Sequence, residues 1–510
     1  MSGIVDEENN DLSSGKGMSL YITIAAGKGL QDIMKTNFGP HGSLKLLVNR
    51  SGEIKLTKEG SVLLREMQIQ NPVASLIAKT VLAQKNFIGD GTLSKILILG
   101  EILKKMEIYL EEGIHPHVLC EGIDLSRREL ERWLHTQIFF NKIDKKVLLN
   151  VAKTIMCTKL NKPLTEKISK IVVEAIMTIY QKNHEIDLNM IEIMEVESSN
   201  ELDTRWVKGI VMDHGARHSD MPKLLNSAFI LLCNASLEYE KTETKANYLT
   251  NSVFNNESLS AKERYIINKK VYKIIQLKRF VCKDNNRNFV VINQKGMDII
   301  ALDLLAKEGI LGIRRAKKKN MERISILCNC IPINSFDELS IECLGFAGLV
   351  YEQQIQEDKY TFIENVTNPF SGTILVKGKN SMLRKQIEDC VKNSLKILKE
   401  CIESKKFVEG GGKIEILASD HLLKYAKNIK GKKKLGVEGV GKALLIIPKT
   451  LLENSRNLSE NSKIDFDLSL PKEDRNIDCF TVKKKIYESV CILACQLLLI
   501  DDIIIGKGLG

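Results

Sequence analysis

One short stretch, residues 87–94, combines groups that could hold a phosphate and a metal ion. Its sequence, FIGDGTLS, places the carboxylate of Asp90 between two glycines, and the hydroxyl residues Thr92 and Ser94 follow at once. Glycines that lead into a helix N-terminus expose unpaired backbone N–H groups, which bind anions together with the helix dipole. A carboxylate beside a phosphate needs a cation between them, and Mg²⁺ suits both partners. An exposed turn before a helix would have the same residues, so both interpretations stay open at this point.

Two other patterns compete as candidate sites. Residues 436–443, GVEGVGKA, come close to the phosphate-binding pattern GxxxxGK[ST], but Ala443 has no hydroxyl for Mg²⁺ and no strand pattern precedes the stretch. We therefore predict a buried helix there, with small residues at close contacts. His214 and His218 have the i, i+4 spacing of metal ligands, yet the sequence offers no third ligand set, and a polar loop is the favoured interpretation.

The loop at residues 87–94 is expected to join two helices. Apolar residues at helical spacing predict one helix over residues 74–84 and another from Thr92, which Gly113 ends. The His-Pro-His run at 115–117 is interpreted as part of that same helix terminus. The candidate phosphate loop would thus lie directly at the N-terminus of the second helix.

The rest of the chain changes pattern twice. Residues 29–37 predict a helix that FGPHG ends, and residues 44–57 predict a strand hairpin. β-type runs within residues 208–365 predict an α/β domain, and helical patterns return after about residue 380. Residues 237–280 are first polar and then amphipathic. This order predicts a middle domain inserted into a helical one; the strand candidates are KGIVM, AFILLC, NFVVINQ, ISILC and AGLVYEQQI.

The bulk composition predicts a soluble cytosolic protein of several domains. The 510 residues exceed what one core usually serves, and only residues 1–16 lack an apolar period. The net charge of +11 comes from short basic runs without interleaved aromatics, such as 483–485, which we interpret as solvated faces and not as a nucleic-acid site. Twelve cysteines without a CxxC spacing favour a reducing compartment. We find no secretory signal and no membrane-spanning run.

Four glycine-rich segments that join helices, GPHG, LTKEG, GDGT and VEGGGKIE, form a set that resembles the group II chaperonins. Longer segments extend this resemblance over most of the chain and are similar to one subunit type of the eukaryotic cytosolic member of the family. These segments are EMQIQNPVASLIAK, VMDHGARHSDM, CNASLEYEKTE, VVINQKGMD and RRAKKKNMER. The short motifs are specific to the family, and the long ones are specific to the subunit type.

The resemblance implies a multidomain α+β chaperonin fold. The family has a helical equatorial ATPase domain, a split intermediate hinge domain, and an inserted α/β apical domain that binds substrate. A helical protrusion of the apical domain serves as a built-in lid, and the stretch near 240–275 is its candidate here. The implied domains are equatorial 1–140 and 402–510, intermediate 141–207 and 366–401, and apical 208–365.

The resemblance also implies ATP or ADP and Mg²⁺ as cofactors, together with the residues that would hold them. Asp90 would bind Mg²⁺. Gly411 and Gly412 would let the ribose approach the backbone, and Asp478 would bind the ribose hydroxyls. The positions around the phosphates would be Asn37, Gly39, Pro40, Lys58, Gly91, Thr92, Leu93 and Ser94. The catalytic positions would be Asp90, Glu59 and Asn393.

Three of these positions depart from the family pattern. Leu93 replaces a threonine, so one phosphate hydroxyl is missing, and Glu59 replaces an aspartate that helps to orient the attacking water. Asn393 falls where the family has an aspartate that activates water, and an amide cannot accept the proton of that water. Losing a general base typically costs about 10²–10⁴ in rate. We therefore predict a chain that binds ATP but hydrolyses it slowly; Asp389, one helical turn away, is the alternative base.

By the same resemblance, the chain would be an ATP-dependent molecular chaperone subunit. It would join seven paralogous subunits in a cytoplasmic hetero-oligomeric double ring and enclose unfolded polypeptides such as cytoskeletal proteins. Nucleic acid and membrane are not expected as partners. A non-hydrolysing structural ring subunit is the nearest alternative. A metabolic Mg²⁺-dependent phosphotransferase would need an acceptor pocket and a base, and the sequence shows no such constellation.

Overall fold

The computed structural model describes residues 18–48, 52, 54–139, 144–181, 184–238, 253–283, 287–456 and 476–502. The predicted loose start at 1–16 and part of the lid candidate, residues 240–252, lie outside these ranges. The chain divides into two compact units. The first comprises Met1–Val173 and Asp389–Gly510, and the second comprises Glu174–Glu388, so the second is inserted in sequence within the first.

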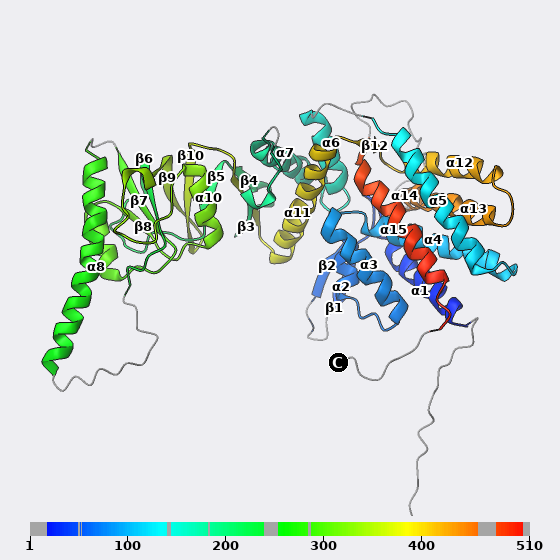
Figure 1. The fold of residues 1–510 in the computed structure, drawn as a ribbon, viewed down its shortest axis with the longest axis horizontal. Helices are drawn as coiled ribbons and strands as arrows, with labels where there is room; N and C mark the ends of the chain where they lie inside the picture. The colour runs from blue at the N-terminus through cyan, green and yellow to red at the C-terminus, as the bar shows by residue number, and fades with distance from the viewer. Residues whose placement is uncertain are drawn as a thin grey trace, which may run out of the picture. The chain divides into compact units, whose positions relative to one another are not determined.

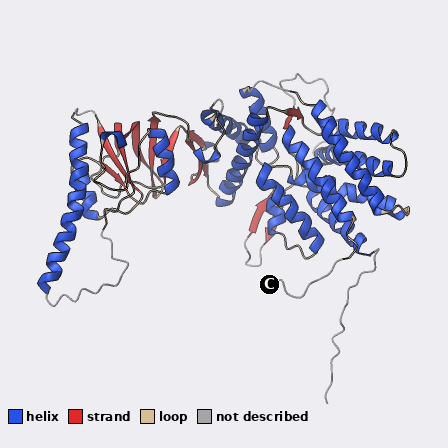
Figure 2. Ribbon diagram, in the orientation of Figure 1, coloured by secondary structure: helices blue, strands red, loops and turns tan. Residues whose placement is uncertain are grey.

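The first unit is mostly helical and builds its core around helix α4 (Thr92–Glu111) (Figures 1 and 2). Residues 95–100 of α4 are all buried, and four successive apolar residues, 96–99, cover every side of the helix there. Helices α1, α13 and α15 pack around it. The other elements of this unit are α1 (Met18–Lys35), β1 (Lys45–Val48), β2 (Ile54–Thr57), α2 (Gly60–Glu66), α3 (Pro72–Ile88), α5 (Pro116–Thr136), α6 (Lys145–Met156), β12 (Phe407–Glu409), α12 (Lys413–Lys427), α13 (Lys433–Leu444), α14 (Ile446–Arg456), β13 (Ile477–Cys479) and α15 (Phe480–Leu498).

Most local predictions for this unit are confirmed. The helices predicted at 74–84 and from Thr92 are α3 and α4, and the predicted hairpin is the antiparallel pair β1–β2 with Lys45 opposite Thr57. The helix predicted at 29–37 is the last part of the longer α1. The short pair β12–β13 was not predicted, because each strand has only three residues.

The interpretation of the His-Pro-His run as a helix terminus is wrong. His115 is the N-cap of α5, and its Nδ1 accepts a hydrogen bond from the backbone N–H of His117 at 3.2 Å. Pro116 occupies the first turn, where its fixed φ suits a helix and no backbone N–H is required. The run therefore begins a helix.

The near-match to a phosphate-binding pattern at 436–443 lies inside α13, as predicted. Its residues are almost all buried, and α13 packs against α5 and α12. A pattern that lies within a continuous helix has no free loop with which to cradle phosphate. The stretch therefore contributes packing to the first unit.

The second unit holds a six-stranded mixed sheet in the order β5-β10-β9-β6-β7-β8 (Figure 2). Strands β6, β7 and β8 run parallel to one another, and β9 pairs antiparallel with both β6 and β10. The long helix α8 (Val253–Val281) lies along this sheet (Figure 1) and buries Val271 and Ile274 in its core. The other elements of this sheet region are β5 (Gly209–Met212), β6 (Leu224–Cys233), β7 (Asn288–Asn293), α9 (Ile299–Lys307), β8 (Leu311–Ile313), α10 (Lys318–Cys328), β9 (Gly345–Ile355) and β10 (Asp358–Val366).

Four of the five strand candidates are strands, but ISILC is not. Residues 324–328 form the last part of helix α10, where Ile324 and Leu327 are buried and Ile326 is exposed. Burial at i and i+3 is the signature of a helix, and a short apolar run does not by itself separate a strand from a buried helix. Strands β8 and β10 were missed.

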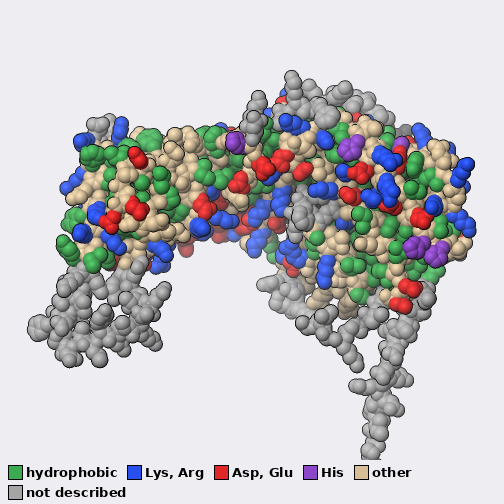
Figure 3. Space-filling model, viewed as in Figure 1, with side chains coloured by type: hydrophobic (Ala, Val, Ile, Leu, Met, Phe, Trp, Pro, Cys, Tyr) green, Lys and Arg blue, Asp and Glu red, His purple; other side chains and the backbone are tan. Residues whose placement is uncertain are grey.

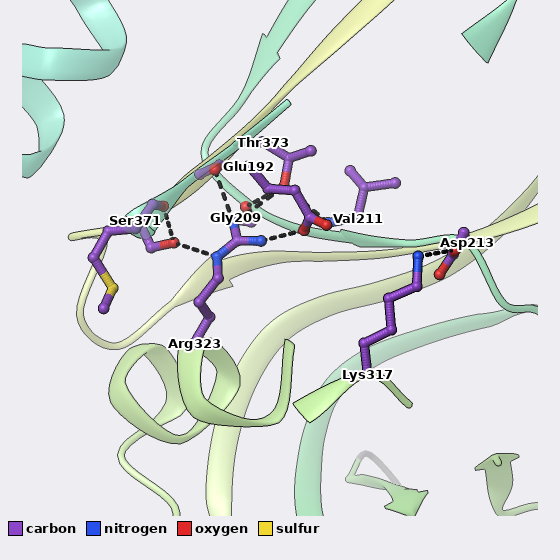
Figure 4. Close-up of polar contacts among 10 residues, drawn as sticks. Glu192, Gly209, Val211, Asp213, Lys317, Arg323, Ser371 and Thr373 are labelled. Carbon is purple, nitrogen blue, oxygen red and sulfur yellow. Dashed lines mark hydrogen bonds and ion pairs between the residues drawn. The ribbon is translucent and has the colours of Figure 1, made fainter. Parts of the chain in front are cut away.

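The same unit also contains a smaller sheet, β3-β11-β4, and one buried arginine joins this sheet to α10. Arg323 forms an ion pair with Glu192 and donates hydrogen bonds to Ser371 Oγ at 3.1 Å and to the carbonyl of Gly372 at 2.8 Å (Figure 4). A planar guanidinium can satisfy several acceptors at once, so this single side chain fixes the helix to the sheet. The remaining elements are β3 (Ile191–Glu197), β4 (Arg205–Val207) and β11 (Gly372–Gly378), with α7 (Lys162–Ile179) and α11 (Ser381–Ser404) shared between the units.

Candidate functional site

A cavity of ≈ 790 Å³ in the first unit brings together segments that lie far apart in the sequence. Its volume is in the range of pockets that enclose a small-molecule ligand. Every cofactor-binding position carried over from the resemblance lines this cavity: Asn37, Gly39, Pro40, Lys58, Gly91, Thr92, Leu93, Ser94, Gly411, Gly412 and Asp478. Asp90 and Glu59 line it as well.

The loop around Asp90 is shaped by two glycines in the left-handed region. Gly89 ends α3 with φ +94°, and Gly91 is the N-cap of α4 with φ +89°. A side chain at position 91 would be strained, and its Cβ would lie 2.5 Å from Cδ1 of Ile486. The tight turn holds the Asp90 carboxylate beside the first turn of α4, whose backbone N–H groups have no intrahelical acceptor.

Asp90 faces a lysine that the sequence did not single out. Lys159 Nζ lies 3.7 Å from Asp90 Oδ1 and also lines the cavity. Burial alone would lower the pKa of Lys159, but the carboxylates of Asp90 and Glu59 raise it well above its ordinary value. The charged ammonium therefore adds a positive group to the wall beside the helix N-terminus, which favours an anionic ligand.

The segment 37–41 supplies a buried donor that has no partner. Asn37 is 1% exposed, and its Nδ2 makes no hydrogen bond to any residue the structure describes. A buried donor without an acceptor costs about 1–3 kcal/mol, so its presence in the wall of a cavity fits a site built for a ligand oxygen. Lys58 Nζ donates to the carbonyl of Pro40 at 2.9 Å, and Asn454, missed in the sequence, donates to the carbonyl of Phe38 at 2.8 Å.

Glu59 and Asn393 lie in direct contact. Asn393 Nδ2 donates to Glu59 Oε1 at 3.2 Å, and the asparagine is only 6% exposed. Glu59 also pairs with Lys85 and accepts a hydrogen bond from Ser61 Oγ at 3.0 Å. Burial would raise the pKa of Glu59, but the charges of Lys159 and Lys85 and the hydrogen bonds from Lys85 and Ser61 hold it below its ordinary value.

The structure thus brings Asn393 to the rim of the cavity, although Asn393 itself does not line it. Asp389, the alternative base, lies one turn earlier on α11 and is not among the cavity-lining residues. An amide that donates to a carboxylate leaves its carbonyl oxygen as a weak acceptor, so this pair can hold a water but contains only one group able to take a proton.

Residues of β12, β13 and the start of α12 also line the cavity. Gly412 is the N-cap of α12, and Asp478 in β13 pairs in register with Val408. Asp478 Oδ2 lies 3.1 Å from Lys483 Nζ. The interpretation of the whole run 483–485 as a solvated face is therefore wrong for Lys483, because the first turn of α15 directs this lysine inward to two carboxylates.

Lys85, Lys159 and Lys483 had no detectable signal in the sequence. Lys85, Lys159 and Lys483 each pair with a carboxylate that lies tens of residues away, and Lys483 also pairs with Asp478, five residues before it. Apolar spacing could have indicated only which faces of α3 and α15 are buried, because Lys159 lies in the turn after α6 and not in a helix. A lysine on such a face is a candidate partner for a carboxylate, because charged groups are rarely buried unpaired.

The other candidate sites hold local contacts. His214 Nε2 lies 2.9 Å from the carbonyl oxygen of Arg315, and His218 faces Asp303 at 3.7 Å. Among the described residues, no three His, Cys, Asp or Glu side chains are grouped to hold a metal ion.

On the face drawn in Figure 3, basic and acidic side chains are intermixed. Within the described ranges, no helix is both long and apolar enough to cross a membrane.

Comparison with known proteins agrees with the family resemblance of the sequence. Residues 30–508 match the TCP-1/cpn60 chaperonin family. The chain is 42% identical over 503 residues to T-complex protein 1 subunit zeta-2 of Homo sapiens, and 42% identical over 503 residues to the Mus musculus protein of that name. Each alignment covers 95% of this chain and 95% of the relative. The subunit type to which the long segments are similar is the zeta type, so that prediction is confirmed. The chain belongs to the TCP-1/cpn60 chaperonin family.

Proposed function

We propose that this chaperonin subunit binds ATP with Mg²⁺ in the cavity of the first unit and hydrolyses it slowly. The observation that carries the proposal is the convergence, in one cavity, of a helix N-terminus, a carboxylate between two glycines, and a buried amide nitrogen without a partner among the described residues. The carboxylate fits the metal ion, and the helix N-terminus and the amide nitrogen fit the phosphate oxygens of a metal-bound nucleotide. The family membership supports the same assignment.

The residues divide into three groups along the cavity. Asp90 would hold Mg²⁺, which would neutralise phosphate charge when bound. The phosphate oxygens would be met by the N-terminus of α4, by Thr92 and Ser94, and by Asn37 Nδ2. The ribose would lie near Gly411, with Asp478 accepting hydrogen bonds from its hydroxyls.

Slow hydrolysis follows from the pair Glu59–Asn393. Glu59 is held charged by Lys85 and Lys159 and can orient a water, but its low pKa makes it a weak acceptor of the proton of that water. Asn393 supplies no second base. Leu93, beside Thr92, adds no hydroxyl to the phosphate loop. The nucleotide would therefore persist at this subunit longer than at a subunit with an aspartate at position 393.

We further propose that the chain works in a cytosolic hetero-oligomeric double ring with seven paralogous subunits, which encloses unfolded polypeptides such as cytoskeletal proteins. Residues 1–140 and 402–510 would form the equatorial domain, 141–207 and 366–401 the intermediate domain, and 208–365 the apical domain. Helix α8 would form part of the lid. The subunit names of the relatives and the family match support this organisation.

The proposal is tested by nucleotide binding to the full-length chain. ATP affinity is measured with and without Mg²⁺ in the natural chain, in Asp90→Asn, and in Asp303→Asn, a matched control at an exposed acid of the second unit. We expect Mg²⁺ to strengthen binding in the natural chain and in Asp303→Asn. In Asp90→Asn we expect affinity to fall about tenfold or more, or about 1.4 kcal/mol.

Two outcomes would overturn the proposal. One is the absence of ATP binding in the natural chain, and the other is equal Mg²⁺ dependence in all three proteins. Phosphate release measured in the same samples separates the two ring functions: no turnover with tight binding indicates a structural, non-hydrolysing subunit. Co-expression with the paralogous subunits should give a ring-sized particle on size-exclusion chromatography. A phosphotransferase would instead elute apart from these subunits, at a smaller size.

A further inference from the structure

We propose that Lys483 is a positioning residue that aligns Asp478 for recognition of the nucleotide ribose. The proposal rests on the proposed function, because it assumes that the cavity binds a nucleotide. It assigns to Lys483, together with Glu415, the task of fixing the sugar specificity of the site.

The geometry is a chain of charges that runs from the cavity wall into the core. Lys483 Nζ lies 3.1 Å from Asp478 Oδ2 and 2.5 Å from Glu415 Oε1. Tyr487 donates its hydroxyl hydrogen to the same Glu415 oxygen at 3.2 Å. Asp478 is at the cavity end of this chain, and Glu415, with a side chain only 2% exposed, is at the buried end.

Two helix starts meet at this lysine. Lys483 is in the first turn of α15, five residues after Asp478, and Glu415 is in the first turn of α12, three residues after its N-cap Gly412. The ammonium group therefore ties together the two helix ends that border the ribose end of the cavity. A change in its position would move both Asp478 and the glycine turn.

The Asp478 carboxylate is also confined on its other side. A Cβ at Gly410 would lie 2.9 Å from Asp478 Cγ, so only glycine leaves room for the carboxylate there. Gly410 and Lys483 thus confine the carboxylate of Asp478, which lines the cavity. A carboxylate fixed in this way discriminates between a ligand that has hydroxyl groups and one that lacks them.

The charge balance explains why the lysine is buried. Burial alone would lower the pKa of Lys483, but the carboxylates of Glu415 and Asp478 hold it well above its ordinary value. Glu415 Oε2 is buried and has no hydrogen-bond partner among the described residues. Glu415 thus depends largely on Lys483 for compensation of its charge, and the lysine is held in place by an anchor that does not touch the cavity.

The test measures sugar discrimination. The affinities of the full-length chain for ATP and for 2′,3′-dideoxy-ATP are compared in the natural chain, in Asp478→Ala, and in the double variant Glu415→Gln/Lys483→Met. The double variant removes the buried pair together, because a lone carboxylate left in the core would be destabilising. Lys484→Met is the matched control, since the neighbouring Lys484 pairs with Glu131 at 2.7 Å and does not line the cavity.

We expect the natural chain and Lys484→Met to prefer ATP by about tenfold or more, because a site built to hydrogen-bond a hydroxyl rejects the analogue that lacks it. In Asp478→Ala and in the double variant, ATP affinity should fall to the level of dideoxy-ATP, whose own affinity should not change. A general loss of structure would weaken both ligands equally. If the double variant does not fold, Lys483→Gln, whose amide can still donate a hydrogen bond to Glu415, carries the same test with the same expected loss of discrimination.

Failure of this inference can be told apart from failure of the proposed function. If the natural chain binds no ATP, the proposed function falls and this inference falls with it. If Asp478→Ala loses discrimination while the double variant and Lys483→Gln keep the ratio of the natural chain, only the positioning role of Lys483 is overturned. Equal loss for both ligands in these variants would also overturn it.

Discussion

Replacing Asn393 by aspartate is expected to raise the rate of ATP hydrolysis by this subunit. The asparagine is almost fully buried and donates a hydrogen bond to Glu59 at 3.2 Å, so the new carboxylate would lie at the cavity rim, where a base is missing. A positioned general base contributes about 10²–10⁴ in rate. Two adjacent carboxylates raise the pKa of one of them, while Lys85 and Lys159 oppose this effect. We therefore expect a gain of about 10²-fold, or about 2.7 kcal/mol of barrier.

The assay is single-turnover phosphate release from the full-length chain with saturating Mg²⁺ and ATP, measured from pH 5 to 9. The aspartate acts as a base only when it is deprotonated, so the rate of Asn393→Asp should rise with pH and then level off, whereas the natural chain should show a flatter profile. Asn393→Ala, which removes the amide but adds no base, is the matched control and should not gain rate. If Asn393→Asp binds ATP within twofold of the natural chain and still hydrolyses it no faster, the assignment of position 393 is refuted.

Further predictions follow from single contacts. In denaturant titrations, Gly91→Ala should lower the free energy of unfolding by about 2 kcal/mol or more, because φ is positive and Ile486 occupies the space of the new Cβ. Gly113→Ala, where φ is also positive but the space is open, should lower it by only about 1 kcal/mol. Arg323→Met should lower the protection of β3 and β11 in hydrogen exchange by about 3 kcal/mol, because the partly exposed carboxylate of Glu192 loses its buried partner. Lys317→Met removes an exposed ion pair and should lower the protection by less than about 1 kcal/mol. Equal exchange in the two variants would contradict the role of Arg323 as a buried link between helix and sheet. The pKa of Glu59 is held below its ordinary value of 4.5, so its stabilising contribution is present above that pH and is lost as the pH falls through the lower folded value. Thermal unfolding of Glu59→Gln should lack this acid-side loss, and an unchanged pH profile would contradict the reasoning.

The sequence predicted the candidate site better than it predicted the charges around it. Asp90 and the turn that holds it were identified because glycines, a carboxylate and a helix start lie within eight residues. Local signals of this kind depend on backbone chemistry that acts over short distances. The same is true of the hairpin at 44–57 and of the start of α4.

What the sequence could not predict depends on contacts between distant segments. Lys159 carries no local signal, and only the fold brings it to Asp90. Lys483 is near Asp478 in the sequence, but only the fold brings it to Glu415 in α12. Lys483 was even assigned to the solvent, because a run of three lysines is usually exposed. The wrong strand prediction at 324–328 has a related cause. A run of five apolar and polar residues fits both the period of a strand and that of a helix, and packing against the sheet decides which of the two forms.

A density map of the protein in saturating ATP and Mg²⁺, from crystallography or electron microscopy, tests the central claim most directly. The account predicts nucleotide density in the cavity, with its phosphates at the N-terminus of α4, a metal ion against Asp90, and its sugar beside Asp478. A map that shows this cavity without nucleotide, or nucleotide bound with Asp90 directed away from it, would contradict the account.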